Sequence, residues 1–208
     1  MTSFIKRSAA CLTLLLALAP AQAQDGDVEA GQIKAYTCTG CHGIPGYNNV
    51  YPTYHVPKLG GQNYDYLVAA LKAYRDGSRN HATMQAQAGS MSDEDIADVA
   101  AYFVSVADVH GGEPEPGGRP PRAGAVAQEK LATCIGCHGE DGNGVITTYP
   151  RLAGQYVDYM LHALKAYKAG ERQNAIMAGI VTALTEKDME ALAAYYGSKT
   201  GLTDLEID

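Results

Sequence analysis

The strongest constraint on this chain is an internal repeat, because three of its segments recur in the same order. The pairs are TCTGCHG at 37–43 with TCIGCHG at 133–139, YDYLVAALKAYRDGSR at 64–79 with YVDYMLHALKAYKAGER at 156–172, and MSDEDIADVAAYF at 91–103 with LTEKDMEALAAYY at 184–196. We therefore expect two domains of about 85 residues with the same fold, and a longer loop after residue 43 in the first copy.

The two copies are joined by GGEPEPGGRPPR, residues 111–122, which is rich in Pro and Gly. These residues break helices and strands, so the segment is typical of an extended linker. On this basis the sequence predicts an N-terminal domain at 24–110 and a C-terminal domain at 123–208.

Residues 1–23 have the pattern of a secretory signal peptide. Lys6 and Arg7 precede a short apolar run, and Ala21 and Ala23 provide the small residues of a cleavage site. The run is too short for a stable membrane span, so we expect export to the periplasm and a mature chain without a transmembrane anchor. A buried N-terminal helix is the alternative. The formal net charge of −7 argues against nucleic-acid binding, which needs a basic surface.

Each copy has the periodicity of amphipathic helices. Apolar side chains recur at helical spacing over 63–76 and 156–169, and Gly77 and Gly170 then end each stretch. Further helices are expected at 28–37 and 125–134, and after the N-caps Ser92 and Thr185, each of which has an Asp three residues later. No segment alternates convincingly like a strand, so the predicted class is all-α.

Each copy also contains one C-x-x-C-H motif, the attachment pattern of haem c. The motif residues are Cys38, Cys41 and His42 in the first copy and Cys134, Cys137 and His138 in the second. Cysteines at this spacing on a helix present both sulfurs on one side, where they can form thioethers with the haem vinyl groups, and the histidine that follows becomes an iron ligand. We therefore expect two covalent haem c groups, which would also fill the cores of two small domains.

Other chemistry is possible for the same cysteines. Four cysteines in an oxidising compartment can form disulfides, a C-x-x-C pair can be a redox dithiol, and two such pairs can bind one structural zinc. The histidine after each pair, and the presence of one pair in each copy of the repeat, favour haem.

The repeat also selects a second iron ligand, because a ligand used by both domains should be present in both copies. Met84 corresponds to Met177. The other methionines pair with different apolar residues: Met91 with Leu184, Met160 with Leu67 and Met189 with Ile96. Core positions exchange apolar residues in this way. Met84 and Met177 are therefore the predicted axial ligands opposite the motif histidines, whereas the alternative is that they too belong to the core.

Histidines outside the motifs do not occur in pairs. His55, His81 and His162 correspond to Thr148, Asn174 and Ala69, respectively. Ligation by two histidines is therefore disfavoured, although His55 or His81 could serve as a distal ligand in the first domain alone.

Two further pairs lie before the second repeated segment. Pro57 corresponds to Pro150, and the carbonyl of each could accept the Nδ1 proton of the motif histidine and so fix its orientation. Lys58 corresponds to Arg151, and these cations could pair with haem propionates or could be ordinary solvated side chains.

With these features the chain resembles cytochrome c4, a family of periplasmic dihaem class I c-type cytochromes. The resemblance rests on both CxxCHG motifs, on YPRLAGQYVDYMLHALKAYKAGER with a Met shortly beyond, and on the closing LAAYY; the second copy also has GEDGNG, where the first has the longer GIPGYNNVYPTYHVPKLGG. It implies two tandem class I cytochrome c-type domains with a pseudo-twofold arrangement, His/Met-ligated haems, and electron transfer to a terminal oxidase or another respiratory partner.

The sequence therefore predicts an electron carrier and not an enzyme, since filled axial positions leave no iron site for a substrate. Expected partners are redox proteins such as a terminal oxidase, a quinol-oxidising complex or a periplasmic dehydrogenase. The competing interpretations are a dihaem peroxidase or dehydrogenase subunit with one open haem, which would require Met84 to be only a core residue, and a zinc module.

Overall fold

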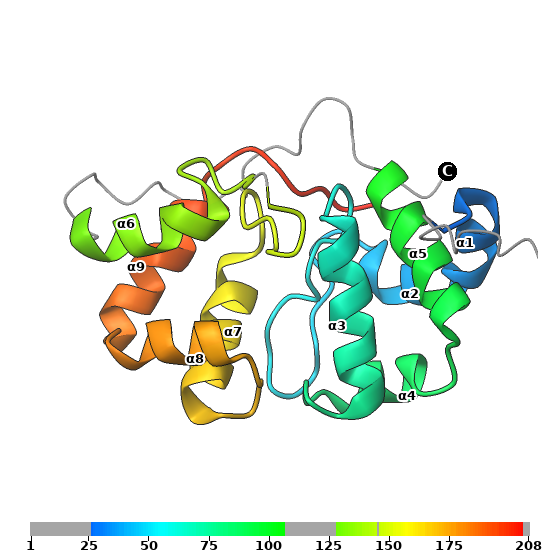
Figure 1. Ribbon diagram of the computed structural model, residues 1–208, viewed down its shortest axis with the longest axis horizontal. Coiled ribbons are helices and arrows are strands. Elements are labelled where there is room, and N and C mark those ends of the chain that lie inside the picture. Colours follow the sequence, from blue (N-terminus) through cyan, green and yellow to red (C-terminus); the bar gives the residue numbers. More distant parts are fainter. Residues whose placement is uncertain (1–25, 107–127, 145, 206–208) are drawn as a thin grey trace, which may run out of the picture.

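The structure is a computed structural model that describes residues 26–106, 128–144 and 146–205. Within these ranges the chain forms helices and isolated β-bridges but no strand, which confirms the all-α class. The helices form two groups that lie side by side (Figure 1). The predicted signal peptide, 1–23, and linker, 111–122, lie outside the described residues. In the described part of the chain no helix is long and apolar enough to cross a bilayer.

Each group of helices contains one copy of the repeat. The N-terminal domain contains α1 (Val28–Lys34), α2 (Tyr36–His42), α3 (Tyr64–Asp76), α4 (Ala82–Ala88) and α5 (Asp93–Ser105). The C-terminal domain contains α6 (Gln128–His138), α7 (Val157–Ala169), α8 (Ala175–Thr182) and α9 (Glu186–Gly197). The helix predicted at 28–37 is instead two helices that meet at Ala35, and both C-x-x-C-H motifs are themselves helical.

Local sequence signals account for the helix ends. Gly77 and Gly170 follow α3 and α7 in the left-handed conformation, with φ of 84° and 76°, which glycine adopts without steric cost. Ser92 and Thr185 begin α5 and α9 with complete capping boxes. These four ends are therefore confirmed as predicted.

Each domain has its own apolar core. The buried residues of the N-terminal core are Ala35, Leu67, Val99, Ala100, Phe103 and Leu205, and those of the C-terminal core are Leu131, Met160, Val181, Leu184, Met189, Leu192, Ala193 and Tyr196. Met160 and Met189, which the repeat assigned to the core, are 6% and 3% exposed. Met91 packs against the N-terminal core and its counterpart Leu184 is buried in the other.

Two glutamines join the domains by equivalent hydrogen bonds. The Gln155 side chain accepts from the Lys58 N–H at 3.0 Å and donates to the Lys58 carbonyl at 3.0 Å. The Gln62 side chain does the same with the Arg151 N–H at 2.7 Å and the Arg151 carbonyl at 3.1 Å. Because each domain gives and receives the same pair of bonds, the contact has the pseudo-twofold character that the family resemblance implied.

The longer loop of the first copy, residues 44–56, contacts the C-terminal domain. The Tyr54 ring stacks on His162 with 4.1 Å between ring centroids. His55 Nδ1 lies 2.7 Å from Asp158 Oδ2, and the His55 N–H donates to the same oxygen at 3.1 Å. The longer loop of the first copy thus forms part of the domain interface.

The last described residues, 201–205, return to the N-terminal domain. Thr203 and Gly60 exchange two backbone hydrogen bonds of 3.2 Å. Leu205 is 2% exposed and belongs to the N-terminal core. Asp204 accepts a hydrogen bond from the Tyr156 hydroxyl at 2.8 Å. A segment that follows the second repeat in sequence therefore completes the core of the first.

We expect Leu205→Ala to lower the free energy of unfolding of the N-terminal domain by about 2–5 kcal/mol, because it removes a buried side chain and leaves a cavity. Denaturant unfolding followed by circular dichroism measures the change. The control is Val104→Ala on α5, whose side chain is 38% exposed and whose loss should cost within about 0.5 kcal/mol. Equal effects of the two substitutions would contradict the core position of Leu205.

Candidate cofactor site

A cavity of about 1140 Å³ extends between the two domains. It exceeds the roughly 300–1,000 Å³ of a pocket for one small molecule. Among its lining residues are all the predicted haem attachment residues and iron ligands: Cys38, Cys41, His42 and Met84 from the first copy, and Cys134, Cys137, His138 and Met177 from the second. Two large apolar groups, one for each set of predicted ligands, therefore match the space and its lining.

The four motif cysteines are half-buried on α2 and α6, and no disulfide joins them. Burial raises the pKa of the Cys38 and Cys134 thiols. The two C-x-x-C pairs lie in different domains, and the described residues contain no group of three or more His, Cys, Asp or Glu side chains placed to hold a metal ion. Because the two pairs lie on helices of different domains, each pair forms a separate candidate attachment site.

Each motif histidine is buried, with His42 8% and His138 6% exposed. His42 Nδ1 lies 2.8 Å from the Pro57 carbonyl oxygen, and His138 Nδ1 lies 2.9 Å from that of Pro150. A carbonyl can only accept, so Nδ1 carries the proton and Nε2 keeps its lone pair. Burial also lowers the pKa of His42 to about 4, and lowers that of His138, so both rings are neutral at physiological pH as iron ligation requires.

Met84 and Met177 occupy the third position of α4 and α8, two short helices that the sequence analysis did not predict. The Met84 N–H donates to His81 Nδ1 at 3.3 Å, and the Met177 N–H donates to Asn174 Oδ1 at 3.0 Å. The N-cap side chain thus fixes the backbone of the methionine itself. Asn174 is a strongly preferred N-cap residue and was the available signal for α8.

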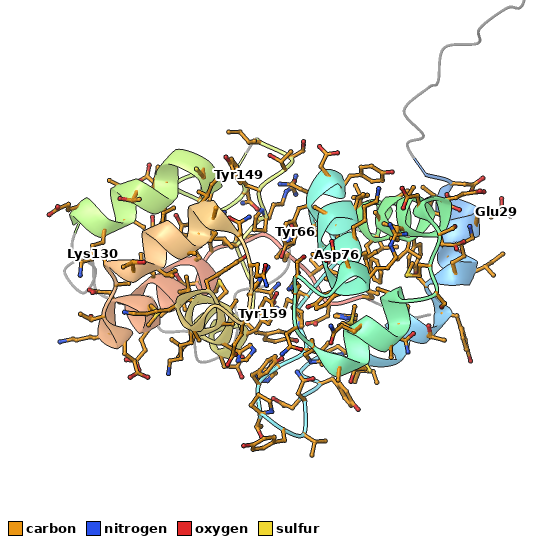
Figure 2. The ribbon with its side chains drawn as sticks, turned by 60° about the horizontal axis from the view of Figure 1, so that its bottom comes forward. Glu29, Tyr66, Asp76, Lys130, Tyr149 and Tyr159 are labelled. Carbon is orange, nitrogen blue, oxygen red and sulfur yellow. The ribbon has the colours of Figure 1, made fainter. Side chains whose placement is uncertain are left out.

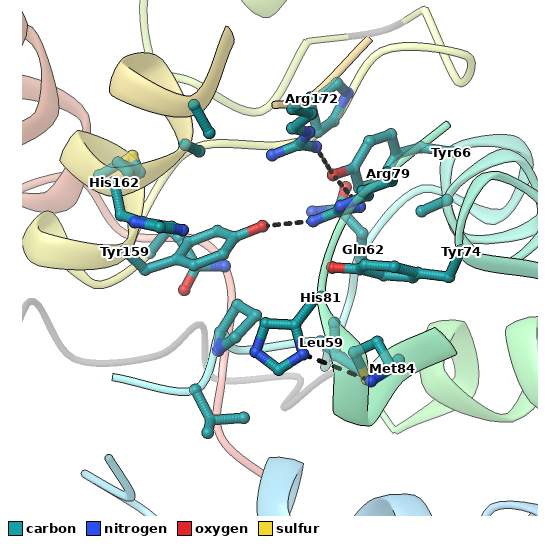
Figure 3. A pocket seen from close by; sticks show the side chains of 18 of the residues that line it. Leu59, Gln62, Tyr66, Tyr74, Arg79, His81, Met84, Tyr159, His162 and Arg172 are labelled. Carbon is teal, nitrogen blue, oxygen red and sulfur yellow. Dashed lines mark hydrogen bonds between the residues drawn. The ribbon is translucent and has the colours of Figure 1, made fainter. Parts of the chain in front are cut away.

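The two other histidine candidates have different environments. His55 lies in the domain interface, where its ring stacks on Tyr156 and its Nδ1 contacts Asp158. His81 lines the cavity, but its Nδ1 is occupied as the N-cap of α4 (Figure 3). The equivalent positions in the second copy are Thr148 and Asn174, so Met84 and Met177 stay the candidates that are matched in both copies.

Lys58 and Arg151 also line the cavity, and each has a protein partner. Lys58 Nζ lies 3.8 Å from Asp204 Oδ2, and Arg151 Nε donates to Asn63 Oδ1 at 3.1 Å. Contact of these cations with haem propionates stays a prediction.

A second group of cations, which was not predicted from the sequence, lies at the centre of the interface. Arg79 donates to the Tyr159 hydroxyl, and Arg172 donates to the Tyr66 hydroxyl, both at 2.8 Å (Figure 3). Tyr66 and Tyr159 lie between the two groups of helices (Figure 2). Burial alone would raise the pKa of Tyr66, but the charges and hydrogen bonds of Arg172 and Arg79 lower it to about 7. These four residues are identical in both copies, so the repeat that selected the methionines also contained this signal.

Comparison with known proteins identifies the family. The Cytochrome c family model matches residues 28–107 and 123–198, one match in each domain. A cytochrome c4 of Pseudomonas aeruginosa is 36% identical over 194 residues, which cover 88% of this chain and 94% of that relative. The chain belongs to the cytochrome c4 family. It is therefore a c-type cytochrome that takes part in electron transfer. Membership of this family implies covalently attached haem c.

The similarity to cytochrome c4 extends to solved structures and to a differently named relative. The reduced recombinant cytochrome c4 of Pseudomonas stutzeri has a TM-score of 0.65 at 32% identity, covering 84% of this chain and 99% of that one. A Thiomonas intermedia protein named thiosulfate dehydrogenase electron acceptor is 30% identical and covers 80% of both chains. The cytochrome c4 match spans both groups of helices, which confirms two tandem class I cytochrome c-type domains.

Asn174→Ala should destabilise α8 by about 1 kcal/mol, because the Met177 N–H loses its capping acceptor. Hydrogen–deuterium exchange at the Met177 amide should accelerate. Asn174→Asp retains an acceptor and should leave the exchange rate close to that of the wild type. If Asn174→Ala and Asn174→Asp exchange equally, the cap does not hold this residue.

Proposed function

We propose that this cytochrome carries single electrons through two covalent haem c groups, one in each domain. His42 and Met84 would bind one iron, and His138 and Met177 the other. The observation that best supports this proposal is the duplicated arrangement of side chains around one cavity. Each motif histidine keeps its Nε2 lone pair, and the methionine at the equivalent position of each copy lines the same cavity.

The chain's residues divide this task among them. Thioethers would retain one haem at Cys38 and Cys41 and the other at Cys134 and Cys137. The haem iron would supply the one-electron redox change. The Pro57 and Pro150 carbonyls hold the ring orientation of the two histidines. A methionine ligand would favour a high reduction potential, and an iron held by both a histidine and a methionine would have no open site for a substrate. The proposal is accordingly an electron carrier and not an enzyme.

The proposed setting is the periplasm, on the basis of the predicted signal peptide at residues 1–23. The proposed partners are redox proteins: a terminal oxidase, a quinol-oxidising complex or a periplasmic dehydrogenase. The relative named thiosulfate dehydrogenase electron acceptor supports a dehydrogenase as one electron donor.

Intact mass spectrometry tests covalent attachment. The mature protein should carry two haem additions, and the double variant Cys38→Ser with Cys41→Ser should carry one. A wild-type chain without haem additions would overturn the proposed function in favour of a zinc or disulfide role for the cysteines.

Redox titration tests the methionine ligands. Met84→Ala should lower the reduction potential of one haem and leave that of the other nearly unchanged. Met177→Ala should lower the potential of the second haem. In each case the variant loses the methionine sulfur, the ligand that favours reduced iron. The methionine-to-iron charge-transfer band should fall by half in each variant. Met91→Ala is the matched control and should change neither potential. A shift with Met91→Ala and none with Met84→Ala would show that the wrong methionine was chosen.

A further inference from the structure

The peptide group that joins Pro57 to Lys58 makes one hydrogen bond within its own domain and one to the other domain. Its carbonyl oxygen accepts from His42 Nδ1 at 2.8 Å, and its N–H donates to the Gln155 side-chain oxygen at 3.0 Å. A peptide group is a planar, conjugated unit. This unit therefore links the motif histidine of the N-terminal domain to a glutamine of the C-terminal domain.

The second copy repeats this arrangement with the domains exchanged. The carbonyl of the Pro150–Arg151 peptide accepts from His138 Nδ1 at 2.9 Å, and its N–H donates to the Gln62 side-chain oxygen at 2.7 Å. The same four roles are thus filled twice by residues at equivalent positions of the repeat.

The two glutamine side chains are held firmly for this contact. Gln62 and Gln155 are each 3% exposed, and each side-chain oxygen also accepts the backbone N–H of the next residue, at 2.9 Å and 3.0 Å. Their orientation is fixed by the network, because a backbone N–H can only donate and a carbonyl can only accept. Gly61 and Gly154, which precede them, have φ of 75° and 74°, so both glutamines follow a left-handed turn.

We propose that Gln62 and Gln155 are positioning residues for the iron-binding histidine of the opposite domain, so that each domain adjusts the reduction potential of its neighbour. This inference rests on the proposed function, since it takes His42 and His138 as haem ligands. Gln155 acts on His42 through the Pro57–Lys58 peptide, and Gln62 acts on His138 through the Pro150–Arg151 peptide.

The sign of the effect follows from hydrogen-bond cooperativity. A peptide whose N–H is hydrogen-bonded has a more negative carbonyl oxygen, which accepts more strongly from the histidine Nδ1. A stronger bond at Nδ1 makes Nε2 a better electron donor to the metal. A better donor stabilises oxidised iron and lowers the potential. Removing the glutamine should therefore raise the potential of the haem in the other domain.

Redox titrations of Gln155→Met and Gln62→Met test the crossed assignment. Methionine has a similar shape but cannot bond the peptide. Gln155→Met should raise the potential of the haem bound by His42, and Gln62→Met that of the haem bound by His138, each leaving the other nearly unchanged. To assign each potential to a haem, the titrations are repeated in proteins that also carry Met84→Ala or Met177→Ala. Met84→Ala should lower the potential of the haem bound by His42, and Met177→Ala that of the haem bound by His138. Each glutamine variant serves as the matched control for the other.

Three outcomes would overturn the proposal. They are no shift in either variant, a shift confined to the glutamine's own domain, and equal shifts of both haems, which a general opening of the interface would produce. Intact mass is recorded first. A wild-type chain without two haems overturns the proposed function as well, whereas glutamine variants that carry both haems at unchanged potentials overturn this coupling alone.

Gln155→Glu provides a second variant if Gln155→Met does not fold. At a pH above the pKa that burial raises, its carboxylate accepts from the Lys58 N–H more strongly than an amide, although the bond to the Lys58 carbonyl is lost. The potential of the haem bound by His42 should therefore fall, and by more than that of the other haem. Proton exchange at His42 Nδ1 is measured in the reduced protein. Compared with the wild type, it should be slower in Gln155→Glu and faster in Gln155→Met. A rise in potential with Gln155→Glu would contradict the mechanism.

Discussion

The structure depends on the hydrogen-bonding demands of two peptide groups in the domain interface, one buried and one half-buried. A buried peptide must satisfy both its carbonyl and its N–H. At Pro57–Lys58 the carbonyl faces the motif histidine and the N–H faces the other domain, and Pro150–Arg151 is arranged in the same way. The orientation of the histidine and the docking of the domains are consequently not independent, because the same planar unit takes part in both.

The features that local sequence determines were predictable. Helix ends at Gly77 and Ser92, and their equivalents in the second copy, follow from backbone freedom and side-chain capping within a few residues of each end. The C-x-x-C-H motifs were readable because covalent attachment requires a fixed spacing. Comparison of the two copies went further and selected Met84 and Met177, which periodicity alone could not distinguish from core residues.

The features that sequence analysis missed are contacts between distant parts of the chain. Nothing local in Gln155 shows that its partner is Lys58, or that Arg79 will reach Tyr159. The longer first loop was visible as an insertion, but its packing of Tyr54 on the other domain required the assembled structure. The short helices that carry the methionines were missed for another reason. They contain too few residues for apolar periodicity to be distinctive, and only the N-cap residues mark their start.

The segment at 201–205 makes the order of the sequence matter. The N-terminal domain comes first in the sequence, yet its core includes Leu205, which follows the last helix of the C-terminal domain. The helices and capped ends of this domain depend on its own residues, but its core is complete only when the residues that follow the C-terminal domain are also present. The half that comes first in the sequence is therefore completed by the end of the other, and neither repeat alone contains everything that the N-terminal fold uses.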